Sequence, residues 1–139
     1  MKIRLIKNKK ELKQVLEIRR IVFIKGQNVP EKRERDGLDK TAKHIIVLYK
    51  NKPIGCARVR FYDKKGKLEW IALLAEYRDR GFGKLIMGYL INYCKKHKIK
   101  EIVLHSQCYV KGFYEKCGFK PRGKIFLDAN IKHIEMYHN

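Results

Sequence analysis

A glycine-containing loop between two apolar segments constrains the fold of this chain more than any other feature. The loop spans residues 77–84 and has the sequence Tyr-Arg-Asp-Arg-Gly-Phe-Gly-Lys. The preceding segment, 68–74, is apolar and β-prone, which predicts a buried strand. The following segment, 85–94, has the pattern of a helix. The chain is therefore expected to pass from a strand, through a tight basic turn, into a helix.

Such a turn favours an anion-binding site. The first backbone N–H groups of a helix have no partner within the helix, and the helix dipole favours negative charge at that end. Gly81 and Gly83 allow a ligand to approach the backbone closely, while Arg78, Arg80 and Lys84 supply positive charge. We therefore predict that the loop binds phosphate groups.

Two common phosphate-binding motifs do not fit this loop. A Walker loop has Ser or Thr after its Gly-Lys pair to bind magnesium, whereas Leu85 follows Lys84 here. A dinucleotide-binding fingerprint requires a third glycine at position 86, which is occupied by Ile86. The phosphate ligand is therefore expected to belong to another class.

A second motif lies downstream of the loop. Residues 112–119 have the sequence Gly-Phe-Tyr-Glu-Lys-Cys-Gly-Phe, a short helix that ends in Tyr-x-x-x-Gly-Phe. Together with the Arg-x-x-Gly-x-Gly pattern of the loop, it resembles the two signatures of the GNAT N-acetyltransferases, in family order and with a predicted strand between them. The resemblance covers nearly the whole chain. Residues 103–107 and 133–136 are similar to the small ElaA/YjcF-type branch of that family.

The pattern of segments predicts an α+β fold in one domain, residues 1–139. Strands are expected at 2–7, 44–50, 53–62, 67–74, 101–107 and in a closing hairpin that ends with 131–137. Helices are expected from the Asn8 cap to a stop at Gly26, at 81–97 and at 108–117. The handedness of crossovers makes strand 101–107 parallel to strand 67–74. The GNAT resemblance implies a mixed, mostly antiparallel sheet of six to seven strands, flanked by about four helices, in which this parallel pair splays apart.

The resemblance also implies acetyl-CoA as co-substrate and assigns roles to particular residues. Backbone groups of Ile71, Ala72 and Leu73 would bind the pantetheine arm, and a free N–H near Leu73 would stabilise the oxyanion. Gln107 stands where many members have an asparagine that contacts the cofactor. Tyr114 would protonate the CoA thiolate, since its pKa is normally near ~10. The pyrophosphate would be bound by Arg78, Asp79, Arg80, Gly81, Phe82, Gly83 and Lys84.

The general base is open at this stage. An amine with a pKa near ~10.4 must lose a proton before it attacks a thioester at neutral pH. Glu69 lies on the strand that leads into the loop, His105 lies on the neighbouring strand, and His133 lies in the last one. We rank them in that order, and each could instead have a structural role.

The net charge of +20 leaves more than one interpretation open. It would attract a polyanion such as CoA or nucleic acid, or it could reflect a lysine-rich proteome. The basic residues are dispersed, and no RNA- or DNA-binding signature is visible, which argues against a nucleic-acid-binding protein. A second alternative is a CoA-binding sensor of the same fold without turnover.

The acceptor is a small-molecule or protein amine whose identity the sequence leaves open. Segment 31–39 contains four of the fourteen acidic residues, and it is either a solvated loop or an acidic wall that attracts a cationic amine. A homodimer is also left open, because dimers are common in the family. The four cysteines have no C-x-x-C spacing, so no metal site or disulfide is predicted. Together with the lack of a signal peptide or apolar span, this predicts a cytoplasmic protein with no membrane partner.

Overall fold

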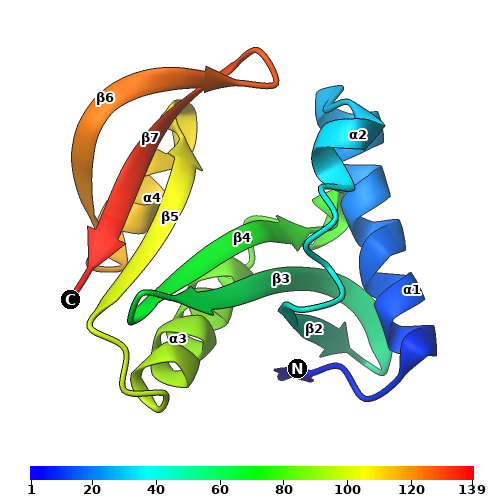
Figure 1. The fold of residues 1–139 in the computed structure, drawn as a ribbon. Helices are drawn as coiled ribbons and strands as arrows, with labels where there is room; N and C mark the ends of the chain where they lie inside the picture. Colours follow the sequence, from blue (N-terminus) through cyan, green and yellow to red (C-terminus); the bar gives the residue numbers. More distant parts are fainter.

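Seven strands form one mixed sheet in the computed structural model, which describes residues 1–139 (Figure 1). The strand order is β1-β2-β3-β4-β5-β7-β6, and every neighbouring pair is antiparallel except β4 and β5. The prediction of a mixed, mostly antiparallel α+β sheet is therefore confirmed. The strands are β1 (Lys2–Leu5), β2 (Lys43–Tyr49), β3 (Lys52–Tyr62), β4 (Lys65–Leu73), β5 (Glu101–Gln107), β6 (Lys120–Asp128) and β7 (Ile131–His138).

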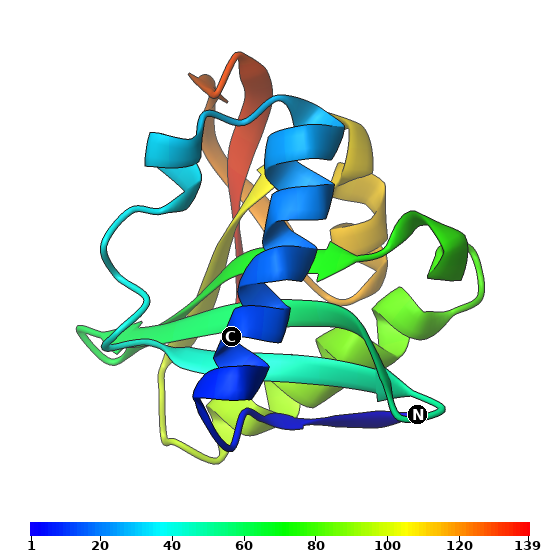
Figure 2. The ribbon, with the colours of Figure 1, turned by 90° about the vertical axis from the view of Figure 1, so that its right-hand side faces the viewer.

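Helices flank both faces of the sheet, as Figure 2 shows. On one face α1 packs through Val15 and Ile18, and on the other α3 packs through Ile86 and Leu90. Because side chains of a strand alternate between faces, the apolar run in β2 supplies both cores. The helical elements are α1 (Lys9–Arg19), the π-helical η1 (Arg20–Lys25), α2 (Glu31–Glu34), η2 (Ala75–Tyr77), α3 (Phe82–Lys95), η3 (Cys108–Val110) and α4 (Lys111–Lys116).

The first helix begins as predicted and ends later than predicted. The Asn8 side chain accepts a hydrogen bond from the Glu11 N–H at 2.9 Å, which confirms the cap. Gly26, the predicted stop, keeps a right-handed φ of −78°, and the helical conformation continues through Gln27. Asn28 is the residue that adopts the left-handed conformation, with φ of 56°. Glycine permits that conformation but does not impose it, and asparagine also tolerates it.

The parallel strands β4 and β5 separate part-way along their length. Their pairing runs from Lys65 opposite Glu101 to Leu68 opposite Leu104 and then stops. Beyond that point β4 pairs with β3 alone and β5 pairs with β7 alone. Figure 1 shows the two strands diverging from this fork. The expected splayed pair is therefore present.

A β-bulge in β4 was not predicted from the sequence. Trp70 and Ile71 together lie opposite Ala57, because Glu69 pairs with Arg58 and Ala72 pairs with Cys56. Trp70 has a positive φ of 48°, which is rare for a bulky residue. The extra residue reverses the alternation of side chains, so Trp70 packs against the α1-side core and Ile71 against the other.

Candidate active site

The N-terminus of α3 forms an anion cradle. Gly81 precedes the helix in the left-handed conformation, with φ of 81°, and Asp79 is also left-handed, with φ of 61°. No side chain caps this helix end, so its first backbone N–H groups, which begin at Phe82, have no side-chain acceptor. Arg78, Arg80 and Lys84 are exposed around it. Uncapped N–H groups, a helix dipole and three cations suit a phosphate ligand.

The two glycines of the loop have different physical roles. At Gly81 a side chain would meet no atom within 4 Å, so glycine is needed there for its backbone conformation. At Gly83 a Cβ would lie 3.2 Å from the ring of Phe113 on α4. Gly83 therefore lets α4 pack closely against the start of α3. Since Tyr114 follows Phe113, this contact holds the predicted acid beside the cradle.

The splayed part of β4 directs unpaired backbone groups into the gap. The Leu74 N–H donates to the Ile54 carbonyl oxygen at 2.9 Å, and hydrogen-bonded and non-bonded pairs alternate along an antiparallel ladder. Leu73, opposite Gly55, is thus a non-bonded position whose N–H faces away from β3, toward the gap beside β5. Ala72 lies opposite Cys56 at a hydrogen-bonded position, so its peptide groups face β3, and its contact with the cofactor stays a prediction.

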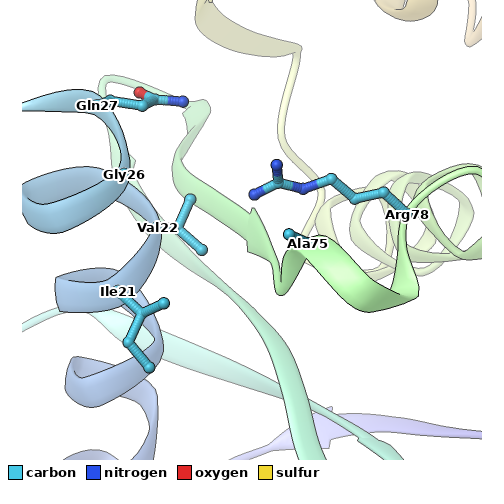
Figure 3. Close-up of a pocket in the computed structure, with 6 residues that line it drawn as sticks. All are labelled: Ile21, Val22, Gly26, Gln27, Ala75 and Arg78. Carbon is cyan, nitrogen blue, oxygen red and sulfur yellow. The ribbon is translucent and has the colours of Figure 1, made fainter.

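A pocket of about 150 Å³ lies between η1 and the segment that follows β4 (Figure 3). Val22 and Arg78 point toward each other across it, and the Arg78 Nε–H donates to the Leu73 carbonyl oxygen at 3.0 Å. This pocket was not foreseen, because the π-helical turn that shapes it has no clear sequence pattern. π-Helical turns are frequent at functional sites. The lining residues are Ile21, Val22, Gly26, Gln27, Ala75 and Arg78.

Gln107 closes one side of the gap through a side-chain contact. Its Nε2 donates to the Oε1 of Gln27 at 2.7 Å, which links the end of β5 to the second residue after η1. The amide of Gln107 is therefore held by Gln27, which lines the pocket, and its contact with a cofactor stays a prediction.

Tyr114 lies on α4, half-buried between aromatic rings. Its ring centroid is 5.2 Å from that of Phe113 and 6.2 Å from that of Phe119. Burial, together with the nearby Cys117 and Tyr109, raises the pKa of Tyr114 to about 12. Its hydroxyl group is therefore protonated at neutral pH and available as a proton donor.

Glu69 and His105 both lie at the fork, because they follow the last paired residues of β4 and β5. Glu69 is bound on two sides: Arg58 Nε donates to its carboxylate at 2.7 Å, and Arg60 Nε does so at 2.9 Å. Burial alone would raise the pKa of Glu69, but these hydrogen bonds and charges outweigh it and lower the pKa. A carboxylate held by two arginines is a weak base.

His105 is less constrained than Glu69. Its Nε2 lies 3.4 Å from the Oε1 of Glu135 on β7, and its ring meets Phe126 edge-on. Burial and the positive charge of Lys67 lower the pKa of His105, although Glu135 opposes them. The imidazole is therefore neutral at pH 7. His133, the third candidate base, has its Nδ1 2.7 Å from the Ile131 carbonyl oxygen.

The acidic segment 31–39 forms neither a solvated loop nor a free acidic wall. Glu34 is fully buried and hydrogen-bonded to Arg19, which is itself 1% exposed. Asp36 and Asp39 accept hydrogen bonds from Arg58 at 2.7–3.0 Å. Three of the four acids are therefore neutralised by buried arginines. The signal was present in the sequence, since Arg19 and Arg58 interrupt otherwise apolar faces of a helix and a strand.

A sheet whose parallel strands separate, an uncapped basic helix N-terminus and a protonated tyrosine on the neighbouring α4 together suit an acetyltransferase that uses an acyl-CoA. The family model described as an acetyltransferase (GNAT) domain matches residues 13–138. The chain therefore belongs to the GNAT family and is an acetyltransferase.

Known relatives agree with this assignment. The chain is 38% identical over 137 residues to the uncharacterized N-acetyltransferase YjcF of Bacillus subtilis, covering 98% of each chain. It is similar in structure to Escherichia coli ElaA, with a TM-score of 0.91, 22% identity and 99% of each chain covered. A GNAT acetyltransferase of Elizabethkingia anophelis with acetyl-CoA bound has a TM-score of 0.78 and 16% identity, with 99% of this chain and 96% of that chain covered. The resemblance to the ElaA/YjcF-type branch is thus confirmed.

The cellular location and assembly of the protein stay predictions. No helix of the structure combines the length and the apolar character that a membrane crossing requires. The cytoplasmic location therefore remains a prediction from the sequence, and the oligomeric state remains open.

Proposed function

We propose that this protein transfers an acetyl group from acetyl-CoA to a primary amine by direct attack within a ternary complex. The observation that carries this proposal is the Leu73 N–H, which faces the gap where the pairing of β4 and β5 ends. Backbone donors in such gaps stabilise oxyanions, because they are fixed in place before the reaction. Membership of the GNAT family supports the same chemistry.

The cradle at α3 would bind the pyrophosphate of CoA, and the edge of β4 would bind its pantetheine arm. In this structure the Arg78 side chain covers the Leu73 carbonyl oxygen, which is one of the groups that pantetheine would use. We infer that Arg78 releases this oxygen and turns to the phosphates when the cofactor binds. The net charge of +20 would accelerate the encounter with a polyanionic ligand.

The reaction would proceed in two steps. The nitrogen lone pair of the neutral amine attacks the thioester carbonyl carbon, and the carbonyl oxygen becomes an oxyanion bound by the Leu73 N–H. The nitrogen then loses a proton to the base, the carbon–sulfur bond breaks, the carbonyl re-forms as an amide, and the CoA thiolate receives a proton from Tyr114, which recovers a proton from solvent after the products leave. A tyrosine whose pKa is raised to about 12 delivers this proton only as negative charge develops on sulfur.

His105 is the better candidate for the base, although the sequence favoured Glu69. The Glu69 carboxylate is bound by Arg58 and Arg60, whereas His105 is neutral at pH 7 and partly exposed at the same fork. Glu135 would orient its ring and stabilise the imidazolium that forms. His105 would remove the amine proton directly or through a water molecule.

The test is acetyl transfer from acetyl-CoA to a panel of primary amines by wild type and by Tyr114→Phe. The variant should reduce kcat by about 100-fold or more while leaving acetyl-CoA affinity unchanged. Tyr109→Phe is the matched control, because Tyr109 is nearby but 74% exposed, and it should retain activity. Equal kcat values in Tyr114→Phe and wild type would refute the role of Tyr114. Acetyl-CoA binding without transfer to any amine would favour a sensor.

A further inference from the structure

One ion pair connects α2 with the end of β6. Arg33 of α2 forms two hydrogen bonds with Asp128 at the end of β6: Nε donates to Oδ1 at 2.9 Å and Nη2 donates to Oδ2 at 2.7 Å. The two residues are 95 positions apart in sequence. Figure 1 shows that α2 and the β6–β7 turn face each other across the space above β4. The pair therefore connects α2 with the β6–β7 hairpin.

The same guanidinium group also lies over an aromatic ring. The Cζ of Arg33 is 5.6 Å from the centroid of the Trp70 indole. Trp70 reaches this position because the bulge gives it a left-handed backbone and turns it to the α1 side. Strained conformations of this kind cluster at functional sites. A carboxylate beside an indole face is a combination that binds organic cations in general.

Asp128 differs from the other carboxylates around the fork in how it is paired. Glu69 is bound by Arg58 and Arg60, and three acids of segment 31–39, Glu34, Asp36 and Asp39, are bound by buried arginines. Asp128 has one partner, Arg33, whose side chain is 45% exposed. An exposed ion pair contributes little net free energy, so another cation can replace Arg33 at low cost.

The position of Asp128 relative to the proposed base suits a second charge on the acceptor. Asp128 pairs with Ile131 on β7, and His105 pairs with Glu135 on the same strand. These two β7 residues are four positions apart, which is about 13 Å along the strand, and β5 and β6 are about 9–10 Å apart across β7, so the backbone positions of His105 and Asp128 are about 16 Å apart. Their side chains are closer, because His105 acts with Arg33 and His133 to lower the pKa of Asp128. An extended polyamine that lies across β7 can therefore reach both side chains.

We propose that Asp128 and the indole of Trp70 bind a cationic group of the acceptor, and that Arg33 occupies this site until the acceptor displaces it. The inference rests on the proposed amine acetylation and specifies its substrate class. The acceptor is a di- or polyamine with one ammonium group at Asp128 and another amine, in its neutral form, at the fork. Arg33 acts as an internal competitor of that ammonium group.

The proposal predicts that Asp128→Asn and Arg33→Ala change the KM for spermidine in opposite directions. With spermidine as acceptor, Asp128→Asn should raise KM at least about tenfold, because the bound ammonium loses a charged partner. Arg33→Ala should lower the KM for spermidine about two- to five-fold, because the competitor is gone. Butylamine, which carries a single amine, should show the same KM in both variants. If both variants shift the KM for spermidine in the same direction, the bridge is structural and the proposal is wrong.

Long-range electrostatics must be separated from binding at the site. Glu31→Gln and Lys32→Ala make the same changes of charge on α2, outside the bridge, and both side chains are exposed. These controls should each change the KM for spermidine less than twofold. If they reproduce the effects of Asp128→Asn and Arg33→Ala, net charge explains the result and the site is refuted.

A binding measurement distinguishes this inference from the proposed function. Calorimetric titration with spermidine, without acetyl-CoA, should show tighter binding in Arg33→Ala than in wild type and loss of binding in Asp128→Asn. If this order is observed but no acetyl transfer occurs, the cation site stands and the proposed function fails. If acetyl transfer to butylamine occurs but Arg33→Ala binds no spermidine, the cation site is refuted and the proposed function stands.

Discussion

Replacing Glu34 by glutamine should destabilise the fold strongly. Glu34 is 0% exposed, and its partner Arg19 is 1% exposed, so neither group can be solvated by water when the pair is broken. Glutamine keeps the shape of the side chain but removes the charge that compensates the guanidinium. Removing one partner of a buried pair typically costs 3–5 kcal/mol. Because Asp39 still contacts Arg19 at 2.7 Å, we expect the lower end, about 3 kcal/mol.

Urea unfolding and thermal unfolding both measure this loss. For a domain of this size, about 3 kcal/mol corresponds to a decrease in Tm of about 10 °C, with an unchanged slope in urea. Glu17→Gln is the matched control, because Glu17 makes the exposed ion pair with Arg20, and it should leave Tm unchanged. A Glu34→Gln variant within about 1 kcal/mol of wild type would refute the view that this buried pair anchors segment 31–39.

Three further predictions concern the site and its surroundings. Gly83→Val should lower stability by about 1–3 kcal/mol because its side chain would overlap the Phe113 ring, and Phe113→Leu should recover part of that loss in urea unfolding. The value of kcat/KM should fall as the pH decreases below 6.5, because His105 must be neutral to act as the base and burial lowers its pKa. An unchanged pH profile in His105→Gln would contradict the assignment of the base. Burial alone would raise the pKa of Asp36, but hydrogen bonds from Arg58 hold it at about 2. Its stabilising contribution should therefore be present above about pH 4 and lost as pH falls toward 2. In Asp36→Asn the free energy of unfolding, measured in urea, should depend less on pH over that range.

Local sequence patterns predicted the elements that depend on neighbouring residues. The Asn8 cap, the passage from β4 through the basic loop into α3, and the parallel return of β5 are determined within short segments or by the handedness of a crossover. The structure confirms each of them. The same patterns located Glu69 and His105 on adjacent strands, and both follow the last paired residues of β4 and β5.

The features that the sequence did not predict depend on contacts between distant residues. The positive φ of Trp70 is imposed by pairing with β3, and no local propensity favours it. Arg58 is bound by acids 19–22 positions earlier in the chain, and Arg33 by an acid 95 positions later. Such pairings decide whether an acidic segment is free or neutralised. For that reason the role expected of Glu69 and of segment 31–39 changed once the fold was known.

Thermal unfolding with and without acetyl-CoA tests the central claim most directly when two glycine variants are compared. Gly81 and Gly123 both have φ of 81° and open space around them, so glutamate imposes the same backbone strain at either position. Only Gly81→Glu places a negative charge at the α3 cradle. Acetyl-CoA at about 100 times its Kd should add about 2.7 kcal/mol of stability to wild type and to Gly123→Glu, and none to Gly81→Glu. No shift in wild type, or equal shifts in both variants, would contradict acetyl-CoA binding at this loop.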